Sequence, residues 1–154
     1  MQKSFWAEAG LLAILFAGCS SLAPPQAGPQ DRVGPHRGVL NVLPGDRGYA
    51  EILNSQIERP SSRGRAPTQL LVYFLTPDLK APAPVAASGV SVKLTAVTDE
   101  PQTVSLEPAP DAGDRLGKNR FASKKGSYYL SNAHGELTAT IDGQPFRAEF
   151  DGGR

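Results

Sequence analysis

Cysteine is nearly absent from this sequence, and charge of either sign is not in excess. The 154 residues include one cysteine, Cys19, which cannot form a disulfide within the chain, so the core must be held by burial alone. Lysine and arginine number 16, against 15 aspartates and glutamates. This balance provides no overall field that would draw the chain to nucleic acid or to an anionic membrane surface.

The sequence also lacks a hydrophobic run long enough to cross a membrane. The unbroken apolar segment Leu11–Ala17 is far shorter than the roughly 20 residues that span a bilayer. It follows Lys3 and ends at the small residues Ala17 and Gly18, a pattern typical of an export signal. We therefore expect residues 1–18 to be a signal peptide and not a membrane-spanning helix.

The lone cysteine follows that apolar segment directly. The tetrapeptide Phe16-Ala17-Gly18-Cys19 resembles the lipobox of bacterial lipoproteins. The resemblance implies cleavage before Cys19, lipidation of its sulfur and acylation of the new amino terminus. Each buried methylene contributes about 0.8 kcal/mol, so several acyl chains would hold the protein firmly at a membrane.

Ser20 follows the cysteine, and within the same resemblance it points to an outer-membrane lipoprotein that faces the periplasm. The inner membrane and the cell surface are the alternative locations. An ordinary secretory signal with an incidental cysteine is the alternative to the lipobox itself.

Residues 19–37 predict a proline-rich tether. They contain Pro24, Pro25, Pro29 and Pro35 with interspersed glycines, and no apolar periodicity. Such segments stay extended and act as semi-rigid spacers at about 3 Å per residue. The folded domain is then expected at residues 38–151.

Short apolar runs with a period of two predict strands in this domain. Val90–Ala96 alternates between apolar and polar side chains. Glu136–Phe150 alternates in the same way around Asp142-Gly143, a pair suited to a tight hairpin turn. Leu70–Leu75 is apolar on both faces and predicts a central strand covered on both sides. Further strands are predicted at Val39–Leu43, Tyr49–Leu53, Thr103–Leu106, Asn119–Ala122 and Tyr128–Ser131.

No window shows the apolar stripe of an amphipathic helix, and 16 glycines and 14 prolines favour turns. The polar loops 58–67 and 108–117 are expected at the ends of the domain. About eight short strands with this spacing predict an all-β fold, a small antiparallel β-sandwich that is broadly immunoglobulin-like.

Histidine is scarce, with His36 in the expected tether and His134 in a turn-like segment. The methionine is Met1, and the resemblance implies that the thiol of Cys19 is blocked by lipid, so sulfur ligands for Cu(I) are excluded from the mature chain. A zinc site would need carboxylates to join both histidines. We expect both to be structural or solvated, with a metal-ligating pair as the alternative.

Motifs for catalysis are lacking as well. The sequence has no GxSxG, no serine–lysine signature, no HExxH and no phosphate-binding glycine loop followed by a helix. Aspartates at positions 46, 78, 111, 114 and 142 sit mostly beside glycine or proline, where turn formation explains them. We predict no enzymatic activity, no catalytic residue and no cofactor.

The most basic segment is KNRFASKKGSYY, which places lysines and an arginine beside Phe121, Tyr128 and Tyr129. A nucleic-acid interface would need a net basic domain, so no nucleic-acid partner is expected. We expect a solvated hairpin whose aromatic side chains enter the core. A contact with an acidic surface of a protein partner is the alternative.

Several longer segments follow one another in a distinctive order: PHRGVLNVLPGD, then VYFL before DLKAPAPVAA, VSVKLTAV, VSLEPAPDAGD before KNRFASKKG, and GELTATIDGQPFRAEF. Over residues 35–150 this order is similar to that of a group of small exported proteins and lipoproteins of unassigned function. Some of these occur beside heavy-metal efflux adaptor proteins. The resemblance implies a β-sandwich without known enzymatic activity that is an accessory to cation efflux.

Together these features predict a lipid-anchored accessory or binding module of the cell envelope. It would hold to the membrane through Cys19 and contact a protein partner such as a transport or efflux complex, with strand addition at a sheet edge as one mode. The first alternative is a periplasmic metal-handling domain that uses His36, His134 and nearby carboxylates. The second is a hydrolase with an unfamiliar site.

Overall fold

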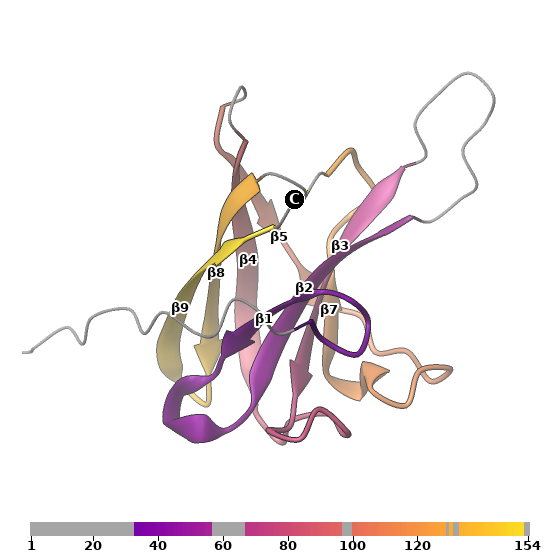
Figure 1. Cartoon of the computed structure of the whole chain (residues 1–154), viewed down its shortest axis with the longest axis vertical. Coiled ribbons are helices and arrows are strands. Elements are labelled where there is room, and N and C mark those ends of the chain that lie inside the picture. Colours follow the sequence, from indigo (N-terminus) through magenta and orange to yellow (C-terminus); the bar gives the residue numbers. More distant parts are fainter. Residues whose placement is uncertain (1–32, 57–66, 97–99, 129, 131–132, 153–154) are drawn as a thin grey trace, which may run out of the picture.

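A computed structural model of the chain describes residues 33–56, 67–96, 100–128, 130 and 133–152 (Figure 1). The predicted signal peptide, Cys19 and the tether up to residue 32 lie outside these described residues. Within the described ranges the regular structure is β-strand and two 3-10 turns, Pro44–Asp46 and Gly117–Asn119, without an α-helix. No helix in this part of the chain has the length and apolarity needed to cross a membrane.

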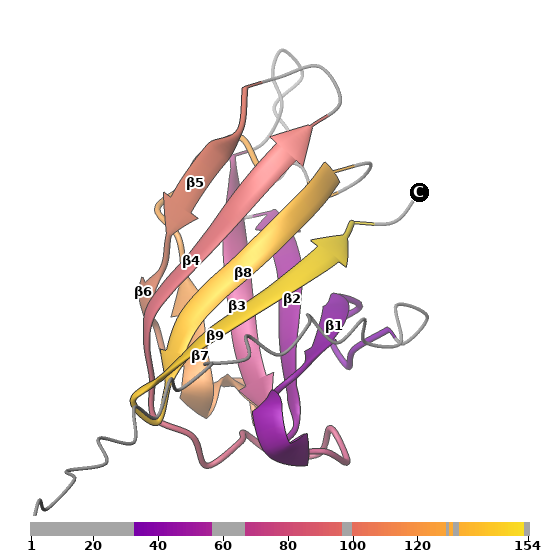
Figure 2. The ribbon, with the colours of Figure 1, turned by 90° about the vertical axis from the view of Figure 1, so that its left-hand side faces the viewer.

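The described residues form nine strands in two antiparallel sheets that pack face to face (Figures 1 and 2). Sheet A has the order β1-β2-β3-β7-β6, and sheet B has the order β5-β4-β8-β9. The predicted small antiparallel β-sandwich is therefore confirmed. The strands are β1 Val39–Val42, β2 Tyr49–Gln56, β3 Thr68–Leu75, β4 Ala87–Ala96, β5 Gln102–Ser105, β6 Glu107–Pro108, β7 Arg120–Ala122, β8 Ala133–Ile141 and β9 Gln144–Asp151.

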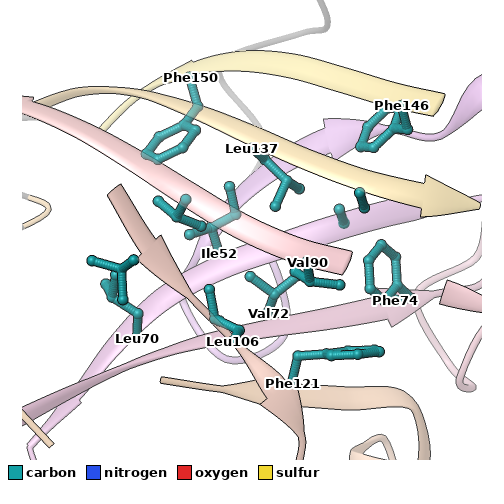
Figure 3. Close-up of a cluster of buried hydrophobic side chains, with 14 of the residues drawn as sticks. Ile52, Leu70, Val72, Phe74, Val90, Leu106, Phe121, Leu137, Phe146 and Phe150 are labelled. Carbon is teal, nitrogen blue, oxygen red and sulfur yellow. The ribbon is translucent and has the colours of Figure 1, made fainter. Parts of the chain in front are cut away.

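The core lies between the two sheets (Figure 3). The alternation in β4 has its predicted result, because Val90 and Val92 are buried there while Lys93 is exposed. From sheet A, Phe74 meets the edge of Phe121 with ring centroids 5.7 Å apart. Full burial of each such side chain stabilises the fold by about 1.5–3 kcal/mol.

The predicted hairpin is also confirmed, with β8 and β9 paired from His134–Asp151 to Ile141–Gln144. Asp142 and Gly143 have φ angles of 49° and 80°, as a two-residue turn of this type requires. The Asp142 carboxylate also accepts the N–H of Ala86 at 2.7 Å, which ties the turn to the residue directly before β4.

Strand β3 is buried on both faces, as its sequence predicts. One face is covered by the loop 108–117, whose predicted place at an end of the sandwich was wrong. Leu71, Tyr73 and Leu75 point away from sheet B and pack against Leu116. The loop 108–117 therefore lies across the outer face of sheet A, and not at an end of the sandwich. The buried, apolar Leu116 holds the loop there. In the other predicted loop, 58–67, residues 58–66 lie outside the described residues.

Several predicted strands differ in their bounds from the observed ones, and two of these differences have a visible cause. Thr103–Leu106 ends at Ser105, because the chain changes sheets at the buried Leu106 and continues as β6 in sheet A. In Tyr128–Ser131, the described residues Tyr128 and Leu130 are not in a strand. Side chains replace the ladder at Tyr128: its N–H donates to Thr68 Oγ1 at 2.8 Å, and its carbonyl accepts from Asn54 Nδ2 at 2.7 Å.

Candidate functional site

His36 belongs to the folded domain and not to a free tether. Val33 forms a β-bridge with Val39, and the Gly34 N–H donates to the Gly38 carbonyl at 3.1 Å. Contacts with the folded unit therefore begin at residue 33, ahead of the predicted start of the domain at residue 38. The His36 side chain is 21% exposed, so it is not a freely solvated side chain.

The turn that carries His36 is fastened by the carboxylate of Glu51 on β2, a side chain with no solvent exposure. Oε1 accepts the backbone N–H groups of His36 at 2.8 Å and Gly38 at 2.9 Å, while Oε2 lies 2.7 Å from Nδ1 of His36. Both glycines of the turn are needed here. A Cβ on Gly34 would lie 2.2 Å from Glu51 Oε1, and one on Gly38 would lie 2.5 Å from the Ile52 carbonyl oxygen.

The other ring nitrogen of His36 faces a second carboxylate. Nε2 lies 3.0 Å from Oδ2 of Asp114, in the loop that covers the outer face of sheet A. The ring also stacks on Tyr73 of β3, with centroids 4.1 Å apart and an interplanar angle of 19°. The ring is therefore held on both edges by carboxylate oxygens and on one face by an aromatic ring.

Two neighbouring groups have shifted pKa values. Burial raises the pKa of Tyr73, against the opposing effect of Arg120. For Asp114, burial raises the pKa, but the Leu116 N–H, the His36 ring and Tyr73 together outweigh it and lower the pKa. Arg120 is itself held by the Ala109 carbonyl at 2.6 Å and by Asp111 at 3.1 Å. The result is a connected polar network beneath the loop.

We name this group the His36 network: His36, Glu51, Tyr73, Asp114 and Arg120. Both ring nitrogens of His36 face carboxylate oxygens at hydrogen-bond distance. In the described part of the chain, no three His, Cys, Asp or Glu side chains are grouped so as to hold a metal ion. The network joins the turn at His36 to strands β2, β3 and β7 and to the loop 108–117, and its chemistry is that of a structural fastening.

His134 lies elsewhere and shares none of these partners. It is on β8, its side chain is 76% exposed, and its Nδ1 pairs with Asp151 of β9. Because Leu137 and Ile141 of the same strand face the core, His134 points outward from sheet B. The His36 network covers the opposite outer face, that of sheet A, so the structure does not bring the two histidines together.

Glu51 is the member of the network that the sequence hypotheses missed. The sequence did contain a signal, a glutamate between Ala50 and Ile52 in a strand whose other members are mostly apolar. A charged side chain buried in such a strand must find hydrogen-bond partners, so this position indicated a polar site. The turn assignment of Asp114 is correct but incomplete. Its Oδ1 accepts the Leu116 N–H at 2.9 Å in a local turn, while its Oδ2 reaches His36 across 78 positions of sequence.

Shallow grooves lie at the margins of the sandwich. One of about 380 Å³ runs between β5 and the segment after β7, and is lined by Val104, Ala122 and Tyr128 among others. Another of about 450 Å³ lies on the outer face of sheet B beside His134 and Asp151. Both are open surface features.

Comparison of the chain with protein-family models, with curated proteins and with solved structures finds no match in any of the three. The functional conclusion therefore depends on the residues and geometry described above.

Proposed function

We propose that this protein is a lipid-anchored accessory module of the cell envelope that binds a protein partner and has no catalytic activity of its own. The observation that carries the proposal is the combination of Cys19 in a lipobox-like segment with a β-sandwich fastened at its amino-terminal end. Retention at the outer membrane, on the periplasmic side, is the location that Ser20 favours.

The position of the His36 network supports the anchoring part of the proposal. A domain tethered through its amino terminus transmits any pull on the tether to the first residues of the folded unit. Here those residues are attached to β2, which lies between β1 and β3 inside sheet A. Hydrogen bonds to a charged group contribute about 1.5–3 kcal/mol each, and Glu51 accepts three in this turn.

The partner-binding part is supported by the sheet edges and by the groove beside β5. A small β-sandwich ends in edge strands, and such strands offer main-chain groups to an incoming chain. The sequence resemblance to exported proteins found beside heavy-metal efflux adaptors favours a transport or efflux complex as the partner.

Membrane fractionation of cells that produce the Cys19→Ser variant tests the anchor. We expect the unaltered protein to sediment with membranes and to resist extraction by high salt, because acyl chains and not charges hold it. The variant should move to the soluble periplasmic fraction or remain unprocessed. Ser21→Ala, which keeps the cysteine, is the matched control and should sediment normally.

Salt-resistant sedimentation of a Cys19→Ser chain that has lost its signal peptide would contradict the proposal. If the variant sediments with membranes but high salt releases it, the result would likewise point to an electrostatic attachment in place of a lipid anchor.

A further inference from the structure

The four edges of the two sheets are protected to different degrees. Natural β-proteins prevent unwanted pairing at edge strands with proline, with charged side chains, with very short strands or with a covering segment. Here the edges are β1 and β6 of sheet A and β5 and β9 of sheet B (Figure 2). Their sequences and registers show which edge lacks these devices.

Strand β9 is protected by proline and charge. The two-residue turn makes Ile141–Gln144 a hydrogen-bonded pair, and the alternation of an antiparallel ladder then directs the main-chain groups of residues 145, 147 and 149 toward the free edge. Position 145 is a proline, which has no N–H to offer. Positions 147 and 149 are Arg147 and Glu149, both exposed.

The edges of sheet A are also protected. Strand β6 has two residues, and the second is Pro108. Strand β1 has four residues, Val33 forms a bridge with Val39 there, and β9 lies alongside (Figure 1). Neither strand leaves an uninterrupted row of main-chain groups.

Strand β5 has four residues, as β1 does, but it has none of the other devices within Gln102–Ser105. The Leu106 N–H donates to the Val90 carbonyl at 2.9 Å, so Leu106 stands in a hydrogen-bonded pair with β4. Alternation along the ladder then makes Val104 and Gln102 hydrogen-bonded to β4, and directs the N–H and C=O groups of Thr103 and Ser105 to the free edge. The strand carries no charge and no proline, and no other described strand pairs with it.

A groove of about 380 Å³ runs along this free edge. The four residues of β5 form one wall, and Ala122, Ser123, Lys124 and Tyr128 lie on the other side. Tyr128 and Val104 supply apolar surface at the bottom, since each is at most 8% exposed. Glu107 and Lys124 contribute one charge of each sign, so the groove favours a nearly neutral occupant over a strongly charged one.

We propose that β5 is the docking edge of this protein, and that it receives an extended segment of a partner protein as an added strand of sheet B. The proposal rests on the partner-binding part of the function proposed above and names its surface. The outward groups of Thr103 and Ser105 bond the main chain of the added strand. Small apolar side chains at alternate positions of that strand enter the groove against Val104 and Tyr128.

Site-specific photo-crosslinking of the full chain in its native cells tests this proposal. A benzophenone amino acid is placed at Gln102, which is exposed and lines the groove, or at the matched position Gln144, exposed on the protected edge β9. We expect an adduct with a second protein from position 102 and little from position 144. Digestion and mass spectrometry should place the crosslink within one continuous segment of that protein.

Two variants separate strand addition from simple proximity. Thr103→Pro removes an outward N–H and leaves the ladder to β4 intact, and Ser105→Lys adds a charge to the edge. Each should lower the adduct yield by about tenfold while far-UV circular dichroism and urea unfolding stay close to those of the parent chain. Lys93→Gln, on the outer face of neighbouring β4, should leave the yield unchanged.

Other outcomes overturn the proposal. An adduct of twice the mass of the chain would mean that a second copy covers β5, and an internal crosslink would mean that the chain covers it itself. An adduct that survives both variants would exclude main-chain pairing. Adducts from position 144 alone would contradict this inference only, whereas no adduct from either position would also contradict partner binding.

Discussion

Replacement of His36 by alanine tests the His36 network most sharply. The substitution removes the ring that bonds Oε2 of Glu51 at 2.7 Å and Oδ2 of Asp114 at 3.0 Å, and that stacks on Tyr73. The Glu51 side chain has no solvent exposure, so Oε2 cannot replace the lost donor with bulk water. Oε1 keeps its two backbone donors, which limits the damage.

The magnitude follows from these contacts. Loss of a hydrogen bond to a buried charged acceptor costs about 1.5–3 kcal/mol. The Asp114 contact contributes less, within about 1 kcal/mol, because that side chain is 25% exposed and can be hydrated again. We expect His36→Ala to lower the free energy of unfolding by about 2–4 kcal/mol.

Urea unfolding followed by circular dichroism measures this change. His134→Ala is the matched control, because that side chain is 76% exposed and its loss should change stability by no more than about 0.5 kcal/mol. In a double-mutant cycle, Glu51→Gln should make His36→Ala less damaging, with a coupling above about 1 kcal/mol. Equal stabilities of His36→Ala and His134→Ala, or an additive cycle, would refute the fastening role.

Three further predictions concern single positions. The pKa of Asp114 lies below its ordinary 3.8 in the folded protein, so its contribution to stability is present above that pH and is lost as the pH falls through the lower folded value. Asp114→Asn should therefore flatten the fall in stability towards acid pH when unfolding is measured at pH 2–5. An unchanged fall would contradict this prediction. Gly38→Ala should destabilise the fold by about 2 kcal/mol or more in urea unfolding, because its Cβ would meet backbone atoms. Gly113→Ala, whose Cβ would have its nearest neighbour at 3.4 Å, should be close to neutral. Equal effects would contradict the close approach of Gly38 to the backbone of β2. Asn41 is 6% exposed and its Nδ2 has no hydrogen-bond partner among the described residues, so Asn41→Leu should raise the midpoint of thermal unfolding, and a marked fall would show that the amide is satisfied.

The strands of the sandwich could be predicted where one local pattern determines them. Alternation in Val90–Leu94 and in the hairpin around Asp142-Gly143 reflects one face in the core and one in water, and burial of the whole of Leu70–Leu75 follows from its continuous apolar run. The end of β5 could not be found in this way. Leu106 continues the apolar alternation, and only the packing of the second sheet decides that the chain leaves sheet B there.

The His36 network lay beyond local patterns for a related reason. Its members come from separate segments that meet only when β2 and β3 pair and the loop 108–117 folds over them. Each residue has an ordinary local explanation: a tether histidine, a turn aspartate, a strand tyrosine. The buried glutamate in β2 was the local sign that a partner had to exist, but nothing near it in sequence identified that partner.

The central claim is that this β-sandwich is held at a membrane by acyl chains on Cys19, and the most direct measurement is mass spectrometry of the amino-terminal peptide from protein isolated out of membranes. The account predicts a chain that begins at Cys19 and carries a thioether-linked diacylglycerol on the sulfur and an amide-linked acyl chain on the new amino group. An unmodified thiol at Cys19, or an amino terminus at any later residue, would contradict it.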